Sequence, residues 1–166
     1  MQGGCQSSKK RCGCHAASPS QREAYYLAAM GLPTTIGRLE HIALPGLGVG
    51  RVEAKVDTGA YRSALHYQRL RLRTVDGVKY LTVTFQMGGK RRTKSFKAFK
   101  RVTVKSSNGE SSRRYLISTR VRLGPYLVRA QFTLFDRSDM KYQVLLGRKF
   151  LRGRFVVDVS GKHLLG

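Results

Sequence analysis

Short runs of β-forming residues dominate this chain from Ile36 to its end. The runs are rich in Val, Leu, Tyr, Phe and Thr, and Gly, Asn or charged residues separate them. Runs of this length and composition are strand signals. They predict strands over residues 50–56, 79–85, 100–105, 114–123 and 127–135. With no fixed-period repeat, the pattern favours a mostly β barrel or barrel-like sandwich.

In the run 114–123, two sets of side chains alternate strictly. One set of side chains is largely apolar and the other largely cationic, so we expect a half-buried strand with the first set inward. The inward set is Tyr115, Ile117, Thr119, Val121 and Leu123. Residues 106–110 separate this run from the preceding one, and Asn108-Gly109 tolerates positive φ. We therefore expect a hairpin there.

The first 35 residues differ in composition from the rest. Residues 1–20 hold Gly, Ser, Lys and Cys with little apolar content, which predicts a disordered leader. Ser20 is a candidate cap for a short helix over residues 21–30, and Gly31 and Pro33 would end that helix. The expected organisation is a leader (1–20), a helix and linker (21–35) and one β domain (36–166).

All three cysteines, Cys5, Cys12 and Cys14, precede the β-rich region, so the fold does not depend on disulfides. Cys12, Cys14 and His15 could hold a metal, but their spacing is not a standard zinc pattern. No metal and no cofactor are predicted. The absence of a long apolar run predicts no membrane span, and we expect a cytoplasmic protein. Organelle import or a lipoprotein site at Cys5 stays open.

The charge balance is strongly basic, with 32 Lys and Arg against 9 Asp and Glu. From Ile36 onward there are 28 basic and 8 acidic residues, so the β region alone carries a net charge of 28 − 8 = +20. Such a field attracts nucleic acid, a ribosomal surface, an acidic membrane or an acidic peptide. Between Lys90 and Arg101, 7 of 12 residues are basic. That run is either a strand edge protected by charge or a binding surface.

A carboxylate follows the first β run. In the segment 54–60, Asp57 is followed by Thr58, Gly59 and Ala60. Small and hydroxyl neighbours expose an acid on a tight loop and leave room for a substrate, as a general base requires. An isolated Asp-Thr-Gly is more often an ordinary turn. A second run, 144–151, is apolar, and Leu146-Gly147-Arg148 within it marks a strand that meets a short helix.

Four ordered motifs together resemble one family. They are Lys55 to Ala60, Ser63 to His66, Asp136 to Met140, and Leu145 to Arg148. The chain is similar, from about Ile36 to Gly166, to the retropepsin-like aspartic peptidases that have been labelled ATP-dependent zinc proteases. The resemblance implies an endopeptidase with a retropepsin barrel, in which the Asp-Thr-Gly loop lies beside the Leu-Leu-Gly strand under a hairpin flap.

The resemblance also assigns roles. Asp57, Thr58 and Gly59 would be catalytic, and Ala60 would contact substrate. The flap would be residues 106–112, with Asn108 and Gly109 over the substrate, although the turn 88–94 is a competitor. His66, Leu146, Gly147 and Arg148 would support the site. Asp136 and Asp139 are interpreted as ion-pair residues that hold a loop.

The chain has a single Asp-Thr-Gly, so the resemblance implies a homodimer in which each copy supplies one Asp57. The zinc and ATP of the family label have no support in the residues. The chain lacks His-Glu-x-x-His and a phosphate-binding Gly-rich loop, and its four histidines are dispersed.

Family members are associated with RimK-type glutamate ligases, so a peptide with a glutamate tail is an expected substrate. A catalytically silent module that binds RNA or the ribosome is the alternative. A metal-dependent hydrolase is a second, weaker alternative.

Overall fold

The computed structural model describes residues 19–105 and 109–165. Two short α-helices and one 3₁₀ turn accompany the strands in this part of the chain. The helices are α1 (Pro19–Ala29) and α2 (Arg148–Leu151), and the turn is Pro45–Leu47. The strands are β1 (Thr34–Gly37), β2 (Leu39–Leu44), β3 (Val49–Asp57), β4 (Ser63–His66), β5 (Arg69–Val75), β6 (Val78–Met87), β7 (Lys90–Phe96), β8 (Lys100–Lys105), β9 (Ser111–Leu123), β10 (Tyr126–Phe135), β11 (Val144–Gly147) and β12 (Phe155–Asp158).

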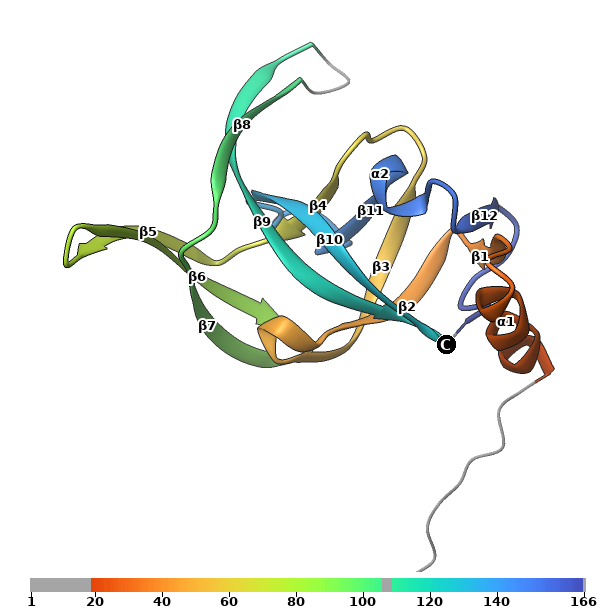
Figure 1. The fold of residues 1–166 in the computed structure, drawn as a ribbon. Helices are drawn as coiled ribbons and strands as arrows, with labels where there is room; N and C mark the ends of the chain where they lie inside the picture. Colours follow the sequence, from red (N-terminus) through yellow and green to blue (C-terminus); the bar gives the residue numbers. More distant parts are fainter. Residues whose placement is uncertain (1–18, 106–108, 166) are drawn as a thin grey trace, which may run out of the picture.

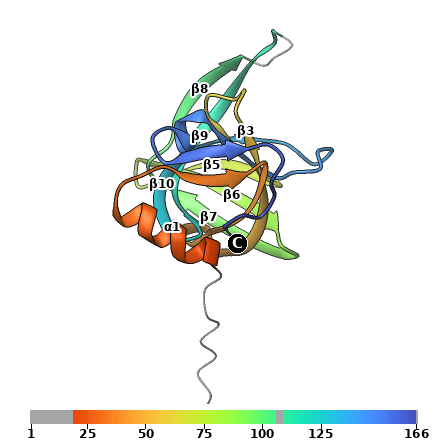
Figure 2. The same cartoon turned by 90° about the vertical axis from the view of Figure 1, so that its right-hand side faces the viewer.

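A ring of strands forms the body of the molecule (Figures 1 and 2). Its largest sheet has the order β10-β4-β11-β3-β2-β9-β8. Strand β10 also pairs with β9, so the sheet returns on itself and β8 continues beyond it. Closure of this kind removes most free strand edges. The predicted mostly β, retropepsin-like barrel with two short helices is confirmed.

The barrel interior is filled by apolar side chains from strands that lie far apart in the sequence. The largest fully buried members are Phe85, Phe132, Ile36, Ile42, Leu44, Leu47, Leu65, Leu81, Ile117, Leu123 and Leu146. In β9 the predicted alternation holds from Ile117 to Leu123, where Ile117, Val121 and Leu123 are buried while Arg120 and Arg122 are exposed, but Leu116 of the predicted outward set is buried as well. Burial of a core of this size is what holds such a barrel together without disulfides.

Two smaller sheets accompany the barrel. Strands β5, β6 and β7 form a three-stranded antiparallel sheet, and the β5–β6 hairpin projects at the left of Figure 1. Its turn, Asp76-Gly77, has positive φ at both residues, as a tight hairpin requires. The other sheet is a parallel pair of β1 and β12.

Several predicted boundaries need correction. The first helix begins at Pro19 and not at Gln21, so Ser20 lies inside it and does not cap it. Proline suits the first turn of a helix because its missing N–H would have no partner there. Strands β1, β2, β4, β5 and β12 were not among the predicted runs, and β7 was expected only as a possible strand edge. In β5, arginine and leucine alternate from Arg69 to Arg73, but the side chains are mostly exposed, and β7 holds no apolar residue before Phe96.

Some expectations fall outside the described residues. These are the disorder of the leader up to residue 18, the Cys12, Cys14 and His15 set, and the position of Asn108. Within the part that is described, no helix is long and apolar enough to cross a membrane.

Candidate active site

Asp57 is the last residue of β3, and the chain turns immediately after it. The turn is fixed by the carboxylate itself, since Asp57 Oδ1 accepts hydrogen bonds from Gly59 N at 3.1 Å and from Ala60 N at 3.0 Å. One carboxylate oxygen is thereby oriented, and Asp57 is only half-buried. The geometry presents the second oxygen for chemistry, as a general base needs.

Gly147 lies directly opposite Asp57 in the parallel pairing of β11 with β3. One step earlier, buried Leu146 is opposite Val56. A Cβ on Gly147 would lie 2.6 Å from the carbonyl carbon and oxygen of Arg62 and 2.9 Å from the oxygen of Ala60. Only glycine therefore lets the loop after Asp57 fold down onto β11.

The start of α2 holds the same loop from the other side. The Arg148 guanidinium donates to Thr58 O at 3.0 Å and to Gly59 O at 2.7 Å. The backbone N–H groups of Arg148 and Lys149 donate to Ala60 O at 2.8 Å and Tyr61 O at 3.0 Å. Four successive carbonyls of the loop thus accept hydrogen bonds from two residues of one helix, which makes the loop rigid.

Ser63 opens the second motif, and the fold gives it a supporting role that the sequence did not assign. Its hydroxyl accepts a hydrogen bond from Gly147 N at 3.1 Å, and its carbonyl accepts one from Thr133 Oγ1 at 3.1 Å. Both bonds are buried. A serine six residues after Asp57 carries no signal of its own, because its partners are 84 and 70 residues away in the sequence.

His66 is buried at the end of β4, and its Nδ1 accepts a hydrogen bond from Arg137 N at 3.0 Å. Asp136 Oδ1 lies 3.6 Å from the same Nδ1. Desolvation by burial lowers the pKa of His66, with Arg137 adding to the effect and Asp136 opposing it. The neutral ring that can accept from Arg137 N is therefore favoured.

Asp136 mainly fixes its own turn. Its Oδ1 accepts from both the backbone N–H and the hydroxyl of Ser138, at 3.1 and 3.0 Å, and these bonds lower the pKa of Asp136. The predicted ion pair reduces to the contact with His66, which requires a protonated ring. Asp139 is exposed, and no ion pair of the described residues includes it.

Arg137 is a second residue whose position the sequence did not indicate. Its Nε donates to Tyr142 O at 2.9 Å, which fixes a half-buried guanidinium beside the site. Burial and the charge of Arg114 lower the pKa of Arg137, whereas the negative charge of Asp57 raises it. Arg137 thus adds a cation to the field around Asp57 and, through its backbone, connects Asp57 to His66.

The two flap candidates lie at opposite ends of the barrel. The β8–β9 hairpin, which includes Gly109 with φ of 87°, rises on the side where the loop after β3 lies in both views (Figures 1 and 2). The β6–β7 hairpin instead lies at the start of β3, because Arg92 Nε donates to Gly48 O and a Cβ on Gly88 would lie 3.6 Å from Arg51 O. Six residues of strand, about 20 Å, separate Arg51 from Asp57.

The fold gathers two histidines that the sequence keeps apart. His41 and His163 stack with ring centroids 4.0 Å apart, and His163 Nε2 lies 2.9 Å from Glu53 Oε1. Ligand atoms of the three residues all lie within 4.8 Å of one another. The Arg51 guanidinium, 2.9 Å from His41 Nδ1, places a positive charge against this group, which disfavours a bound cation.

The zinc of the family label does not fit the residues around Asp57. In the described part of the chain, His41, Glu53 and His163 are the set that could hold a metal, and His41 and Glu53 pair across the middle of β2 and β3. Asp57 lies four residues further along β3, about 13 Å away. We derive no catalytic step through a metal.

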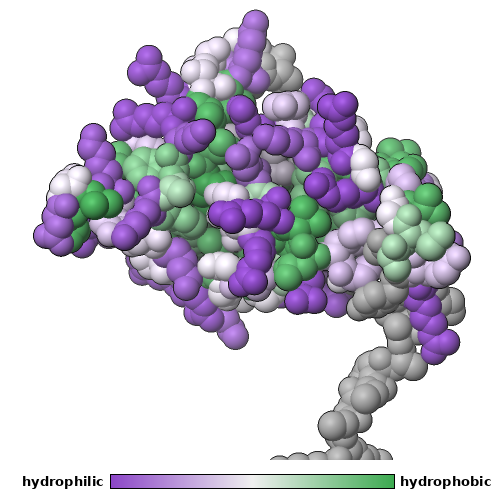
Figure 3. All heavy atoms as spheres, in the orientation of Figure 1, coloured by the Kyte–Doolittle hydropathy of each residue, from purple (hydrophilic) through white to green (hydrophobic). Residues whose placement is uncertain are grey.

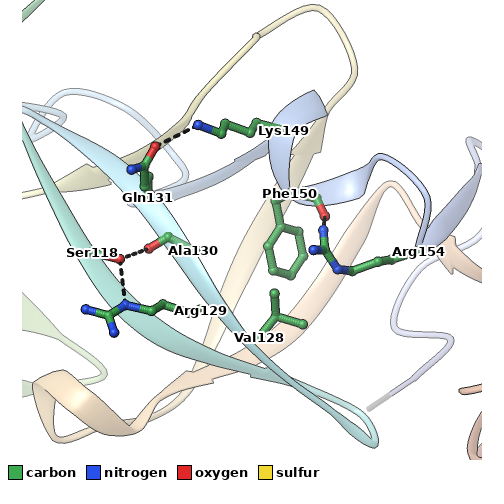
Figure 4. Close-up of a pocket in the computed structure, with 8 residues that line it drawn as sticks. All are labelled: Ser118, Val128, Arg129, Ala130, Gln131, Lys149, Phe150 and Arg154. Atoms are coloured by element: carbon green, nitrogen blue, oxygen red, sulfur yellow. Dashed lines mark hydrogen bonds between the residues drawn. The ribbon is translucent and has the colours of Figure 1, made fainter.

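A surface cavity of about 380 Å³ lies behind α2 (Figure 4). Phe150 and Val128 form its apolar part, and three cationic side chains surround it: Arg129, Lys149 and Arg154. Each cation has a neutral partner, namely Ser118 Oγ, Gln131 Oε1 and Phe150 O respectively. The cavity does not include Asp57, but it shares α2 with Arg148.

Comparison with known proteins decides the family. Residues 35–165 match the model of a family described as retropepsin-like aspartic endopeptidase RimB. The chain belongs to this RimB-like family. The match covers all four motifs that carry the resemblance and includes every strand except β1 in full.

Relatives of this RimB-like chain are larger proteins. Two "probable alpha-L-glutamate ligases", from Shewanella pealeana and Parasynechococcus marenigrum, are 34% and 31% identical to it over 137 residues. Those residues are 79% of this chain, but they span only 30% and 29% of the two relatives. A crystal structure of a Legionella pneumophila protein of unknown function has the same fold, with a TM-score of 0.65 and 22% identity, covering 80% of this chain and 98% of that one.

Proposed function

We propose that the chain is an aspartic endopeptidase that works as a homodimer, with one Asp57 from each copy. The observation that carries the proposal is the orientation of Asp57: two backbone N–H groups fix Oδ1, and α2 holds the loop that supplies them. A carboxylate fixed in this way loses little entropy when it acts on a water molecule. Membership of the RimB-like family supports the same chemistry.

The second carboxylate has to come from another copy, because the chain contains a single Asp-Thr-Gly. Two carboxylates a few ångströms apart do not both ionise readily, so the pair holds one proton. The ionised member removes a proton from a water molecule as the water attacks the peptide carbonyl carbon. The protonated member donates its proton to the carbonyl oxygen, which gives a gem-diol. As the diol collapses, the carboxyl that took the proton from water passes it to the leaving nitrogen, the other carboxylate takes up a hydroxyl proton of the diol, and the C–N bond breaks to give an acid and an amine.

Thr58, Gly59 and Ala60 follow Asp57 on the loop that a substrate would approach. In this proposal the β8–β9 hairpin, with Asn108 and Gly109, is the flap that covers the substrate. The hairpin lies on the Asp57 side of the barrel, whereas the β6–β7 turn does not, and this supports the assignment.

The substrate in this proposal is an acidic peptide, and a glutamate tail is the specific case. The charge of the domain supports this, as does the cavity behind α2, where three cations have only neutral partners in the described structure. Glutamate side chains would replace those neutral partners with charged ones, which form stronger hydrogen bonds. A RimK-type ligase is the partner that the names of the relatives suggest.

Hydrolysis of two peptide sets tests the proposal, one set glutamate-rich and one of mixed composition. We expect cleavage by the wild type, preference for the glutamate-rich set at low salt, and no cleavage by Asp57→Asn. Activity that survives Asp57→Asn sinks the aspartic mechanism. Activity that a chelator abolishes would favour a metal-dependent hydrolase.

A mixing experiment tests the shared dyad directly. Added Asp57→Asn protein should form mixed dimers that lack one ionisable carboxylate. At equal amounts, about a quarter of the dimers keep both Asp57 residues, so activity per wild-type copy should fall by about half. A constant activity per wild-type copy, with light scattering showing that mixed dimers form, would mean that one copy suffices.

A further inference from the structure

The β5–β6–β7 sheet has one face that plays no part in the barrel core. Leu81, Val83, Phe85 and Met87 of β6 are buried, so their face is the inner one. Side chains alternate between faces along a strand, so the even-numbered residues of β6 lie on the outer face. Register places the arginines of β5 on this outer face, with Arg69 opposite Thr84, Arg71 opposite Thr82 and Arg73 opposite Tyr80.

Hydroxyl groups continue the face across β6 to β7. Thr82 and Ser95 hydroxyls lie 3.0 Å apart, as do those of Thr84 and Thr93. Gln86 pairs with Arg91 at the far end. Thr84 itself is buried, so it lies beneath the accessible surface. We call the accessible set the outer face: Arg69, Arg71, Arg73, Tyr80, Thr82, Gln86, Arg91, Thr93 and Ser95. Val75 and Val78 join it only beside the hairpin turn.

The charge around the outer face is almost entirely of one sign. Residues 67–105, which contain β5 to β8, hold 12 Lys and Arg and one acid, Asp76, and register places four of the 12 on the outer face itself: Arg69, Arg71, Arg73 and Arg91. Figure 3 shows hydrophilic side chains crowded around the projecting end that these strands form. None of the 12 takes part in an ion pair within the described structure. A field of this kind binds a partner that carries many negative charges.

The composition of the outer face narrows the partner further. Arg, Thr, Ser, Gln and Tyr are the side chains that contact phosphate oxygens of nucleic acids. A protein partner would need apolar or aromatic anchors at the centre of its interface, and a membrane would need a continuous apolar face. Here the two exposed valines lie at the hairpin tip. Lys97 Nζ covers Tyr80 at 5.5 Å from the ring centroid, so the ring is not free to stack on single-stranded bases.

Protection of a sheet edge does not account for the whole feature. Charges on an edge strand prevent it from pairing with other chains, and β5 is such an edge. That purpose is served by charges of either sign on the edge strand alone. It explains neither the hydroxyl rows on central β6 nor the 12-to-1 excess of basic residues.

We propose that the outer face binds the phosphate backbone of a nucleic-acid duplex without reading its sequence. Alternate residues of a strand are about 6.6 Å apart, so Arg69 to Arg73 span about 13 Å. Over that length one strand of a duplex presents about four phosphates. The binding is separate from Asp57 and would hold the protein at a nucleic-acid-containing assembly while the barrel acts on a peptide.

The salt dependence of duplex binding tests this proposal. The probe is a short DNA duplex of mixed sequence, with the full-length chain as Asp57→Asn so that cleavage plays no part. The slope of log K against log salt is negative, and each phosphate contact that is lost reduces its magnitude by about 0.9. Replacing Arg69, Arg71 and Arg73 with Gln should therefore reduce the magnitude of the slope by about two to three units.

A second triple variant controls for total charge. Arg22, Arg152 and Lys162 are exposed and belong to segments at the right of Figure 1, opposite β5. Changing them to Gln removes the same charge and should reduce the magnitude of the slope of log K against log salt by less than about one unit. Equal slopes for the two variants would overturn the proposal. So would polyglutamate of matched charge binding more tightly than the duplex, which would identify an acidic protein as the partner.

Discussion

Gly147 and Asp57 lie opposite each other in the β3–β11 register, and the loop after Asp57 passes directly over the Gly147 Cα. Gly147, the last residue of β11, thus decides whether the Asp57 carboxylate at the end of β3 is held in place. Backbone atoms of Arg62 and Ala60 occupy the space that a side chain at Gly147 would need.

We expect Gly147→Ala to disrupt both folding and activity. The new Cβ would lie 2.6 Å from backbone atoms, which cannot rotate away as a side chain can. Overpacking of this kind costs about 1–3 kcal/mol or more, and the loop would move away from β11. Denaturant unfolding and peptide hydrolysis measure the two effects. Gly50→Ala is the control, because nothing lies within 4 Å of its Cβ and its free energy of unfolding should change by less than about 1 kcal/mol.

Arg148→Lys should lower kcat/KM while leaving the fold intact. Both hydrogen bonds come from one guanidinium nitrogen, Nη1, which lies one bond further from Cα than the Nζ of lysine, so lysine keeps the charge but loses reach to Thr58 O and Gly59 O. A loop held less firmly misplaces Asp57, and we expect a loss of about tenfold to a hundredfold. Arg152→Lys is the neighbouring control, since Arg152 directly follows α2 and its side chain is exposed. Equal losses in the two variants would show that α2, and not the Arg148 side chain, supports the loop.

The sequence predicted those parts of the molecule whose signal is local. Strand β8 was predicted with its observed ends, and Asp57, Gly147 and Arg148 were singled out because short motifs surround them. The sheet β5–β6–β7 was missed in part, because its two outer strands are exposed and rich in basic residues, whereas runs of apolar β-forming residues were the criterion for a strand. The stability of those strands comes from pairing with apolar β6.

Long-range contacts account for most of what the sequence could not show. Ser63 gains its role from Gly147, Arg137 from Asp57 and His66, and His41 from His163. Each pair joins residues at least 71 positions apart, so even where a motif marked one member, as for Gly147, Asp57 and His66, local composition could not show its partner. Only the register of the closed barrel brings them together.

His66 should make stability depend on pH. Its pKa in the fold lies below the ordinary value of 6.5, so between that folded value and 6.5 the unfolded chain binds more protons than the native one. Stability is therefore complete above pH 6.5 and falls as the pH drops toward the folded pKa of His66. In His66→Asn, whose amide oxygen can still accept from Arg137 N, this fall should disappear. Urea unfolding of both proteins from pH 7.5 to 5 measures it, and parallel curves would contradict the assignment.

Glu40 ties the C-terminal segment to the barrel, and Glu40→Gln should loosen it. The fully buried carboxylate accepts hydrogen bonds from Gly37 N at 2.7 Å, Leu164 N at 3.0 Å and Leu165 N at 3.3 Å. Hydrogen bonds to a charged acceptor contribute about 1.5–3 kcal/mol each, and the amide group of Gln would turn an N–H toward at least one of these donors. We expect a loss of about 2–3 kcal/mol in the free energy of unfolding.

The control for that variant is Glu53→Gln, which alters a partly exposed contact with His163 and should cost less than about 1 kcal/mol. Amide hydrogen exchange separates the local effect from the global one. In Glu40→Gln, the amides of Leu164 and Leu165 should exchange faster than the global loss of stability explains, because their acceptor is weakened directly. If those two amides exchange only as fast as the barrel core, Glu40 stabilises the whole fold and does not specifically anchor the C-terminal segment.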